Sequence, residues 1–438
     1  EILALDAAEL DQAANACRDM GIQAYAVATK FSTRNPAQEN QILDRIQDQA
    51  AVATLGHRLS GLLNFPRRVA TVYYNSAVWR IYNGFADAVE DAARELGLTA
   101  PVYVLKADGG TMPLLLSREQ PVESILSGPA ASVMGMIALC DISEDCIILD
   151  IGGTTTDIAV FAEGSPVIKM EGISVGSYKT LVRALATRSI GIGGDSLLRI
   201  VGGEVRVGPE REGPAMAFGG NKPTLLDALN VQGVTKAGDT SASARGIQGL
   251  AKLWDQLPQP VAEQAVERAV TAIRDAAEDM VWHLNQRPVY TIGELLRDEK
   301  LAPSRVYVMG GPAKAFRKLL GQAFDRDVKV PDDFAVANAV GAALTRPTWS
   351  AELFADTVQG RMLVPNLGVS REIGPGYSLA EARSDASEAL VAHLAQVGVE
   401  SAAVDVTEAM AFAMVDDYGM SGKNIRVACQ VRPGVDKP

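Results

Sequence analysis

The sequence is poor in the residues that build covalent or metal-bound scaffolds. Its 438 residues include only four cysteines, which show no C-x-x-C spacing, and only three histidines, which lie far apart. Small disulfide-stabilised domains and structural zinc sites need denser and more regular patterns of these residues. We therefore expect reduced thiols and a cytoplasmic location, and we expect neither a disulfide scaffold nor a structural zinc site.

Long apolar runs and an excess of positive charge are also missing. No apolar run approaches the roughly 20 residues that a membrane-spanning helix needs, so no membrane segment is expected. Lys and Arg total 41 against 53 Asp and Glu, which gives a formal net charge of −12. This balance disfavours a nucleic-acid partner or an anionic membrane surface, but it leaves room for a local anion pocket.

The composition that remains is typical of a globular α/β protein. The chain is too long for one ordinary core, and two or three packing units are expected. Hydrophobic residues make up 47% and charged residues 21%, and forty glycines accompany stretches that alternate between helical and extended patterns. The pattern of predicted helices and strands changes near Thr348, which indicates a small C-terminal α+β unit from about residue 347.

Local patterns predict several individual elements. Asp6 is placed to cap a first helix that Gly21 ends. The clearest amphipathic helix covers 260–286, is ended by Pro288, and carries His283 as a packed or surface residue. The further predicted elements are a helix at 7–19, a strand at 22–29, a helix at 70–96, a strand at 101–105, a hairpin around Gly360, a helix at 379–396 and a strand at 424–431.

Two predicted helices carry small residues where most helices carry leucine. They cover 127–138 and 335–343 and contain mainly Gly, Ala and Ser. Small side chains let two helices approach closely, so the pattern predicts a close crossing of the two. The alternative is two ordinary alanine-rich helices buried separately.

The strongest functional signal is a glycine- and threonine-rich turn between two apolar strands within 147–161. Asp150 and Asp157 stand at the ends of this turn, and carboxylates of this kind hold magnesium or orient water. Glycines allow close approach of an anion to the backbone, and threonines add donors, so the pattern predicts a phosphate cradle. The alternative is an ordinary glycine-rich hairpin. The residues of the turn are Gly152, Gly153, Thr154, Thr155 and Thr156.

Two further glycine-rich segments are candidates for the same ligand. Gly310 and Gly311 follow a predicted strand and precede Pro312 at a helix start, a pattern that fits a nucleotide base or ribose but also a purely steric junction. The loop 189–196 contains Gly193 and Gly194, which could contact a phosphate, and Asp195, which could reach a metal. The alternative is that Asp195 and Ser196 cap a following helix.

Other polar segments are interpreted as structural. Asp108–Thr111 is more typical of a plain turn than of a site, and Thr224–Asp227 fits a capping box. Arg183 and Arg188 flank the glycine loop and could pair with an anionic ligand, although surface positions are the simpler interpretation. No serine or cysteine can be combined with a histidine into a nucleophilic triad.

Taken together, the order of these motifs resembles the hydantoinase A/oxoprolinase family. The resemblance extends from about residue 20 to residue 346. It implies the actin-like ATPase fold, which is ribonuclease H-like and has two lobes. The motifs that carry it are Leu126–Ala131, Asp150–Asp157, Ile190–Ser196, Gly310–Pro312 and Ala337–Gly341.

The resemblance implies ATP-dependent opening of cyclic amides of the hydantoin or 5-oxoproline type, or a closely related ATP-using subunit. It assigns catalytic and magnesium-binding roles to Asp150 and Asp157, ATP phosphates to the hairpin and to Gly193 and Gly194, and adenosine to Gly310 and Gly311. It also suggests a second subunit of the hydantoinase B type, and a homo-oligomer. The alternative function is an actin-like ATPase that reactivates or assembles a protein partner.

One feature of the family is missing from the chain. A complete member has a second Gly-Gly-Thr-x-Thr-Asp hairpin near its N-terminus, and only one such hairpin is present here. We therefore expect that the N-terminal part of the first lobe is lacking and that the chain alone binds ATP weakly. The expected domains are the rest of this lobe at 1–145, the second lobe at 146–346 and the α+β unit at 347–438. Asp195 replaces a glycine found in many hydantoinases, so the substrate class stays open.

Overall fold

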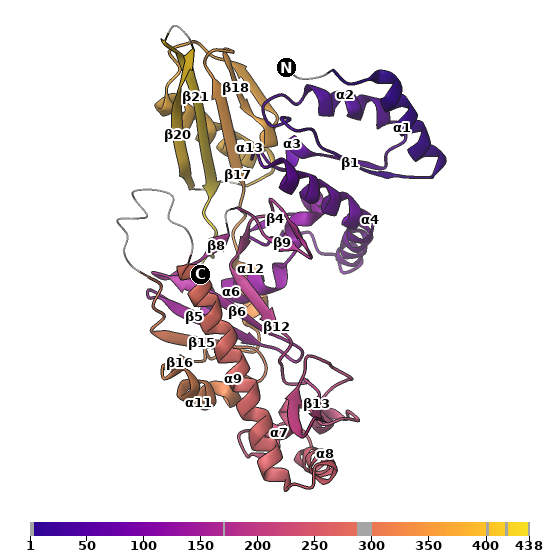
Figure 1. Cartoon of the computed structure of the whole chain (residues 1–438), viewed down its shortest axis with the longest axis vertical. Coiled ribbons are helices and arrows are strands. Elements are labelled where there is room, and N and C mark those ends of the chain that lie inside the picture. Colours follow the sequence, from indigo (N-terminus) through magenta and orange to yellow (C-terminus); the bar gives the residue numbers. More distant parts are fainter. Residues whose placement is uncertain (1–3, 170, 287–299, 400–402, 417–418, 437–438) are drawn as a thin grey trace. The chain divides into compact units, whose positions relative to one another are not determined.

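The structure, a computed structural model, describes residues 4–169, 171–286, 300–399, 403–416 and 419–436 (Figure 1). Helices and strands alternate along the chain, which confirms the predicted α/β class. The chain divides into two units, and each is built from separate segments. Unit 1 comprises Glu1–Ser127, Lys169–Ala184 and Thr345–Gly434, and unit 2 comprises Gly128–Ile168, Leu185–Leu344 and Val435–Pro438.

A mixed sheet forms the centre of unit 2, with the strand order β12-β6-β5-β15-β16 and with β7 paired to β6. Strand β5 runs parallel to β15 on one side and antiparallel to β6 on the other. The central strands are apolar because both faces of the sheet are covered. The bounds are β5 Cys146–Ile151, β6 Thr156–Ala162, β7 Ser165–Pro166, β12 Thr187–Ile190, β15 Arg305–Met309 and β16 Asp327–Lys329.

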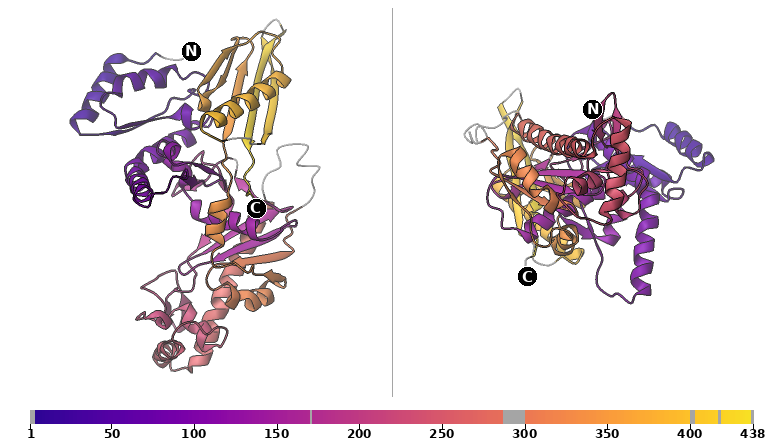
Figure 2. Two further views of the ribbon diagram at one scale, coloured as in Figure 1. Left: turned by 180° about the vertical axis from the view of Figure 1, so that it is seen from behind. Right: turned by 90° about the horizontal axis from the view of Figure 1, so that it is seen from below.

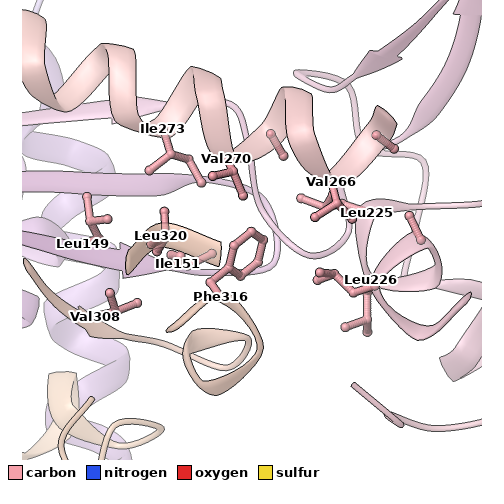
Figure 3. Close-up of a cluster of buried hydrophobic side chains, with 14 of the residues drawn as sticks. Leu149, Ile151, Leu225, Leu226, Val266, Val270, Ile273, Val308, Phe316 and Leu320 are labelled. Atoms are coloured by element: carbon pink, nitrogen blue, oxygen red, sulfur yellow. The ribbon is translucent and has the colours of Figure 1, made fainter. Parts of the chain in front are cut away.

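Helices of unit 2 pack on this sheet and create its main core (Figure 3). Val266, Val270 and Ile273 of one long helix are buried together with Leu149 and Ile151 of β5. The predicted amphipathic face of that helix is thereby confirmed, whereas Pro288 lies outside the described residues. The helices of this core are α7 Leu225–Val231, α8 Thr240–Leu253, α9 Pro258–Asn285 and α11 Ala313–Phe324.

The two small-residue helices of the sequence cross at their glycines. They are α6 Ser127–Leu139 and α12 Ala337–Leu344. A Cβ atom on Gly135 would lie 2.1 Å from the carbonyl oxygen of Ala337, and one on Gly341 would lie 2.4 Å from that of Ala131. The predicted close crossing is therefore confirmed, because the two backbones touch where any side chain would collide.

The N-terminal part of unit 1 pairs β1 Ala24–Val27 in parallel with β2 Val52–Leu55. Asp6 caps the first helix as predicted, since its side chain accepts the N–H groups of Ala8 and Glu9. The long helix begins at Phe65, five residues before the predicted start, because Asn64 caps it and Pro66 fits its first turn. The helices are α1 Ala7–Asp19, α2 Ala37–Ile46, α3 Gly56–Leu59 and α4 Phe65–Glu95.

The C-terminal part of unit 1 is an antiparallel sheet with the order β19-β18-β17-β21-β20. Helix α13 lies across one face of this sheet (Figure 2, left). The helix has the predicted bounds, but the predicted strand at 424–431 is only the inner half of β21. Strand β20 escaped prediction because it is largely exposed and buries no regular apolar face. The elements are β17 Ser350–Asp356, β18 Arg361–Val364, β19 Val369–Glu372, α13 Leu379–Gln396, β20 Val404–Asp416 and β21 Gly419–Val431.

The short pair β3 Tyr103–Leu105 and β4 Thr111–Pro113 encloses the predicted turn at residues 108–111. Asp108 accepts hydrogen bonds from the N–H of Gly110 and from the side chains of Lys106 and Thr348, so this segment is a structural turn. Among the described residues, no helix is both long and apolar enough to cross a membrane.

Candidate functional site

The predicted phosphate hairpin is formed by β5, β6 and the turn between them. The N–H of Gly152 donates to the carbonyl oxygen of Thr155 at 2.9 Å and closes the turn. The antiparallel register places Asp150 opposite Asp157. The two aspartates are seven residues apart in sequence but neighbours in space, as a shared role in binding one cation requires.

The carboxylate of Asp150 is held by two helices. Its Oδ2 atom accepts a 2.6 Å hydrogen bond from the hydroxyl of Ser132 on α6 and a 3.3 Å hydrogen bond from the amide of Asn338 on α12. These two positioning residues were not among the predicted site residues. Their only signal in the sequence is that each is a polar residue within a helix made mainly of small residues.

Asp157 is partly buried beside a second negative charge. Burial raises the pKa of its carboxyl, a hydrogen bond with Ser189 opposes the rise, and the charge of Asp150 adds to it. A bound cation would relieve both unfavourable effects, so these residues fit magnesium. No cluster of three or more acidic, histidine or cysteine ligands occurs in the described part of the chain. The two carboxylates suit Mg²⁺, which keeps several waters and takes few protein ligands.

The glycine loop after β12 packs directly on the hairpin turn. The N–H groups of Gly194 and Asp195 donate to the carbonyl oxygens of Gly152 and Gly153 at 2.9 and 2.6 Å. A Cβ atom on Gly193 would lie 2.6 Å from the carbonyl oxygen of Gly153. The loop therefore requires glycine at position 193 for a steric reason, and its N–H groups fix the turn.

Asp195 and Ser196 stabilise this loop. The carboxylate of Asp195 accepts from the guanidinium of Arg211 at 2.8 Å and from the N–H of Ala215 at 3.2 Å. The hydroxyl of Ser196 accepts from the N–H of Gly193 at 2.8 Å. The chain then enters strand β13 Leu198–Val201, so the interpretation that these two residues cap a following helix is wrong. Both oxygens of Asp195 are engaged, which weighs against a role as metal ligand.

The second glycine pair lies next to Asp150, because β15 is parallel to β5 and Met309 is in register with Asp150. Gly310 has φ +90°, and a Cβ atom there would lie 2.3 Å from the carbonyl oxygen of Ile151. Gly311 is exposed, and a Cβ atom there would have no neighbour within 4 Å among the described residues. Gly310 is thus required by the fold, whereas no described residue crowds Gly311.

The threonines of the turn have different environments. Thr156 is buried, and its hydroxyl donates to the carbonyl oxygen of Ile192 at 2.7 Å. Thr154 is exposed and Thr155 half-buried, and neither hydroxyl bonds to the described part of the chain. The structure therefore brings all the predicted site residues together in unit 2 and leaves Gly153, Thr154, Thr155 and Gly311 facing outward.

The remaining polar candidates have structural partners. Thr224 and Asp227 form the predicted capping box at the start of α7. Arg188 is exposed and pairs with Asp279 on α9. Arg183 was interpreted as a surface residue, which is wrong: its side chain is 14% exposed and pairs with Glu352 within unit 1. Nothing in the local sequence around an arginine signals a partner so far along the chain. His283 is exposed on α9, as expected of a surface residue.

The fold of the chain is that of ATP-dependent enzymes of known structure. It superposes on nucleotide-free acetone carboxylase with a TM-score of 0.70 at 15% identity, covering 100% of this chain and 68% of that one. It superposes on the ATP-dependent caprolactamase from Pseudomonas jessenii with a TM-score of 0.69 at 19% identity, covering 99% and 69%. These similarities confirm the actin-like α/β fold that the sequence predicts.

The family itself follows from the sequence comparison. The hydantoinase/oxoprolinase family model matches residues 68–351, so the chain belongs to the hydantoinase/oxoprolinase family, as its motifs predict. Caprolactamase subunit alpha from Pseudomonas jessenii is 25% identical over 288 residues, which are 62% of this chain and 41% of that subunit. The chain thus spans about two fifths of the length of this curated relative.

Proposed function

We propose that the chain is part of an enzyme that uses ATP to open cyclic amides of the hydantoin or 5-oxoproline type. The observation that carries this proposal is the Asp150–Asp157 hairpin, with Asp150 held by Ser132 and Asn338 and flanked by Gly310 and Gly311. The family match supports this chemistry, as does the name of the caprolactamase relative, since a lactam is a cyclic amide.

In this proposal the outward-facing turn binds the phosphates of ATP. Gly153 lets the backbone approach the anion, and the hydroxyls of Thr154 and Thr155 donate to phosphate oxygens. Gly193 and Gly194 contribute by fixing the turn, because their N–H groups already bond to Ser196 and Gly152. The open side of Gly311 accommodates the adenosine.

Asp150 and Asp157 would hold Mg²⁺, partly through waters, and the ion would neutralise phosphate charge. Phosphorylation of the amide oxygen by ATP, with release of ADP, would activate the ring carbon for attack by water. The ring C–N bond would then break as the nitrogen takes up a proton, and a second water would hydrolyse the resulting acyl phosphate to carboxylate and phosphate. The task of Asp150 is orientation, because its two hydrogen-bond donors fix the carboxylate in one direction. Asp157 supplies a second negative charge, and a bound cation would offset the repulsion between its carboxylate and that of Asp150.

The assembly is part of the same proposal. The relative's name, subunit alpha, supports a second subunit, for which a protein of the hydantoinase B type is the candidate. We extend the proposal to a cytoplasmic location and to a homo-oligomer of the assembled enzyme. The alternative function, an actin-like ATPase that reactivates a protein partner, is not favoured, because the family and the relatives are named for enzymes that act on small molecules.

A calorimetric titration of Mg-ATP into the 438-residue chain tests the nucleotide site. Binding is expected to be weak, and Asp150→Asn should weaken it further by at least tenfold, because a metal-orienting charge is lost. Asp141→Asn, a change at an exposed aspartate of the same unit, is the matched control. Equal binding by all three proteins would contradict the assignment.

Ring opening is tested with a protein in which the N-terminal lobe is restored, in the presence of the candidate hydantoinase B-type subunit. ATP hydrolysis should rise when hydantoin, 5-oxoproline or caprolactam is added, and it should not rise for Asp150→Asn. Stimulation by a protein partner and by none of these amides would support the reactivase function instead.

A further inference from the structure

A cavity of about 80 Å³ lies in unit 1, and none of its lining residues is assigned to the nucleotide. The loop after β1, the loop after α3 and the strands β17, β20 and β21 form its walls. A single water needs roughly 10–15 Å³ by the same measure, so the cavity has room for a small organic molecule. Its lining is Thr33, Arg34, Gly61, Leu62, Leu63, Glu352, Leu353, Phe354, Glu408, Arg426, Val427 and Ala428.

Two arginines that line this cavity have no hydrogen-bond acceptor among the described residues. Within the described part of the chain, neither Arg34 nor Arg426 forms an ion pair or donates a side-chain hydrogen bond, and the Nε atom of each is buried and unsatisfied. Burial lowers the pKa of Arg34, the nearby charge of Arg426 lowers it further, and Asp356 opposes these effects. The Asp356 carboxylate is itself used, because it accepts the N–H groups of Val358 and Gln359 at 2.9 Å.

Thr33 adds an independent sign of a missing ligand. The residue is only 1% exposed, it lines the cavity, and its hydroxyl has no hydrogen-bond partner in the part of the chain that the structure describes. Buried hydroxyl groups are nearly always paired, since an unpaired one is destabilising by about 1–3 kcal/mol. Two guanidinium groups and one hydroxyl are therefore donors without acceptors around a single cavity.

The walls specify the kind of acceptor. The guanidinium of Arg34 stacks 4.6 Å from the ring centroid of Phe354, which fixes the plane of its donor fork. A planar fork matches a carboxylate group. Apolar side chains of Leu62, Leu63 and Val427 form the rest of the wall and suit a short hydrocarbon chain.

Two glutamates at the cavity set its preference for charge. Glu352 is neutralised by Arg183 and also accepts the N–H of Gly61 at 3.3 Å. Glu408 is exposed and has no ion-pair partner among the described residues. Together with Asp356, whose charge acts on Arg34, it offsets the two arginines, so a second negative charge on the ligand is unfavourable and a monoanion is favoured over a dianion such as phosphate.

We propose that this cavity of unit 1 binds the carboxylate group of a small organic acid, held by Arg34, Arg426 and Thr33. This site is independent of the proposed function, because it uses no residue of the hairpin. The affinity for a probe as small as acetate should be on the order of millimolar, since few atoms make contact.

Titration of the full chain with sodium acetate, butyrate or inorganic phosphate tests the proposal, with sodium chloride keeping the ionic strength constant. Calorimetry should detect saturable binding of acetate and tighter binding of butyrate, whose chain meets the apolar wall, with phosphate weaker than both. Arg34→Gln should weaken acetate binding at least tenfold and Thr33→Val several-fold. Arg383→Gln, at an exposed arginine of α13, is the matched control and should not change it.

The two site variants differ in how they disturb the fold, so the test survives if one of them unfolds. Thr33→Val keeps the size of a buried side chain and removes only the unsatisfied hydroxyl. Circular dichroism verifies that each variant is folded before it is titrated. The proposal is overturned if acetate shows no saturable binding, if phosphate binds more tightly than acetate, or if folded Arg34→Gln and Thr33→Val bind like the control.

Discussion

The hydroxyl of Ser132 donates a 2.6 Å hydrogen bond to Oδ2 of Asp150, and the two residues lie 18 positions apart on α6 and β5. Ser132 is 3% exposed and Asp150 is half-buried, so the carboxylate keeps some access to water. One of the two crossing helices thus fixes the direction of the carboxylate proposed to orient magnesium. Ser132 and Gly135 both lie on α6. The helix that touches α12 at Gly135 therefore also positions the carboxylate of Asp150 in the hairpin.

Replacing this serine should separate orientation from folding. Ser132→Ala is expected to reduce stability by only about 1 kcal/mol, because Asp150 keeps Asn338 and access to water. Mg-ATP binding should weaken several-fold, since the carboxylate loses its fixed direction. Urea unfolding and calorimetry measure the two effects, and Ser132→Thr, which keeps the hydroxyl, should recover part of the binding. Unchanged nucleotide binding by a folded Ser132→Ala protein would contradict the positioning role.

The two neighbouring glycines of the proposed adenosine site form a matched pair. Gly310→Ala should destabilise the protein by more than about 1 kcal/mol, because φ is +90° and the new Cβ would meet the carbonyl oxygen of Ile151. Gly311→Ala should leave stability unchanged, because its Cβ would point into open space, but it should weaken ATP binding. Thermal unfolding and titration of both variants distinguish these outcomes. Normal ATP binding by Gly311→Ala would place the adenosine elsewhere.

The carboxyl of Asp157 predicts a pH dependence of stability. Its pKa is raised in the folded state, so the folded protein disfavours the ionised form at neutral pH, and stability improves as pH falls through the raised pKa. Asp157→Asn should therefore stabilise the protein at pH 8, and the gain should shrink as pH falls toward the ordinary aspartate range near 4. Urea unfolding at several pH values measures it. A gain that does not change with pH would show that charge is not the cause.

Saturating Mg²⁺ offers a further check of the same carboxyl. A cation held by Asp150 and Asp157 should reduce the stabilising effect of Asp157→Asn, because it compensates the charge that the variant removes. The comparison requires only unfolding curves with and without the metal. An effect of Mg²⁺ that is equal in both proteins would argue against binding at this pair.

Glu39 predicts the opposite pH behaviour in unit 1. Burial alone would raise the pKa of this carboxylate, but hydrogen bonds from the side chain and the N–H of His57 and from the N–H of Thr29 hold it below its usual value. Its stabilising contribution is present above about pH 4.3 and is lost as pH falls through the lowered pKa. Glu39→Gln should destabilise by about 3 kcal/mol at neutral pH and should flatten the acid limb of the stability profile. Acid unfolding of both proteins tests this, and an unchanged limb would contradict it.

Elements with a strong local pattern could be predicted from the sequence alone. The apolar spacing at 260–286 marks α9 directly, and the helix predicted at 379–396 is α13. The hairpin at Asp150–Asp157 was recognisable because two apolar strands and a glycine turn lie next to one another in the chain. Exposed β20 lacks such a pattern, and only its pairing with β21 defines it.

Partners that come together only in the folded chain could not be predicted. The pairing of Arg183 with Glu352 joins residues 169 positions apart, and that of Asn338 with Asp150 joins residues 188 positions apart. The glycine loop illustrates a different limit. From their types alone Gly193 and Asp195 were candidates for ligand contacts, and their packing against Gly153 and pairing with Arg211 could not be predicted because both depend on tertiary geometry.

The interleaving of the two units constrains how the protein is made. Unit 1 needs residues up to Gly434, so it cannot close while the ribosome is still adding strand β21. Unit 2 has almost all of its segments once Leu344 has been added. Because domains tend to fold as soon as their residues are available, unit 2 should be structured first during synthesis. The segment 1–127 would stay incompletely folded until its C-terminal sheet has been synthesised. Chaperones would bind the segment during that interval.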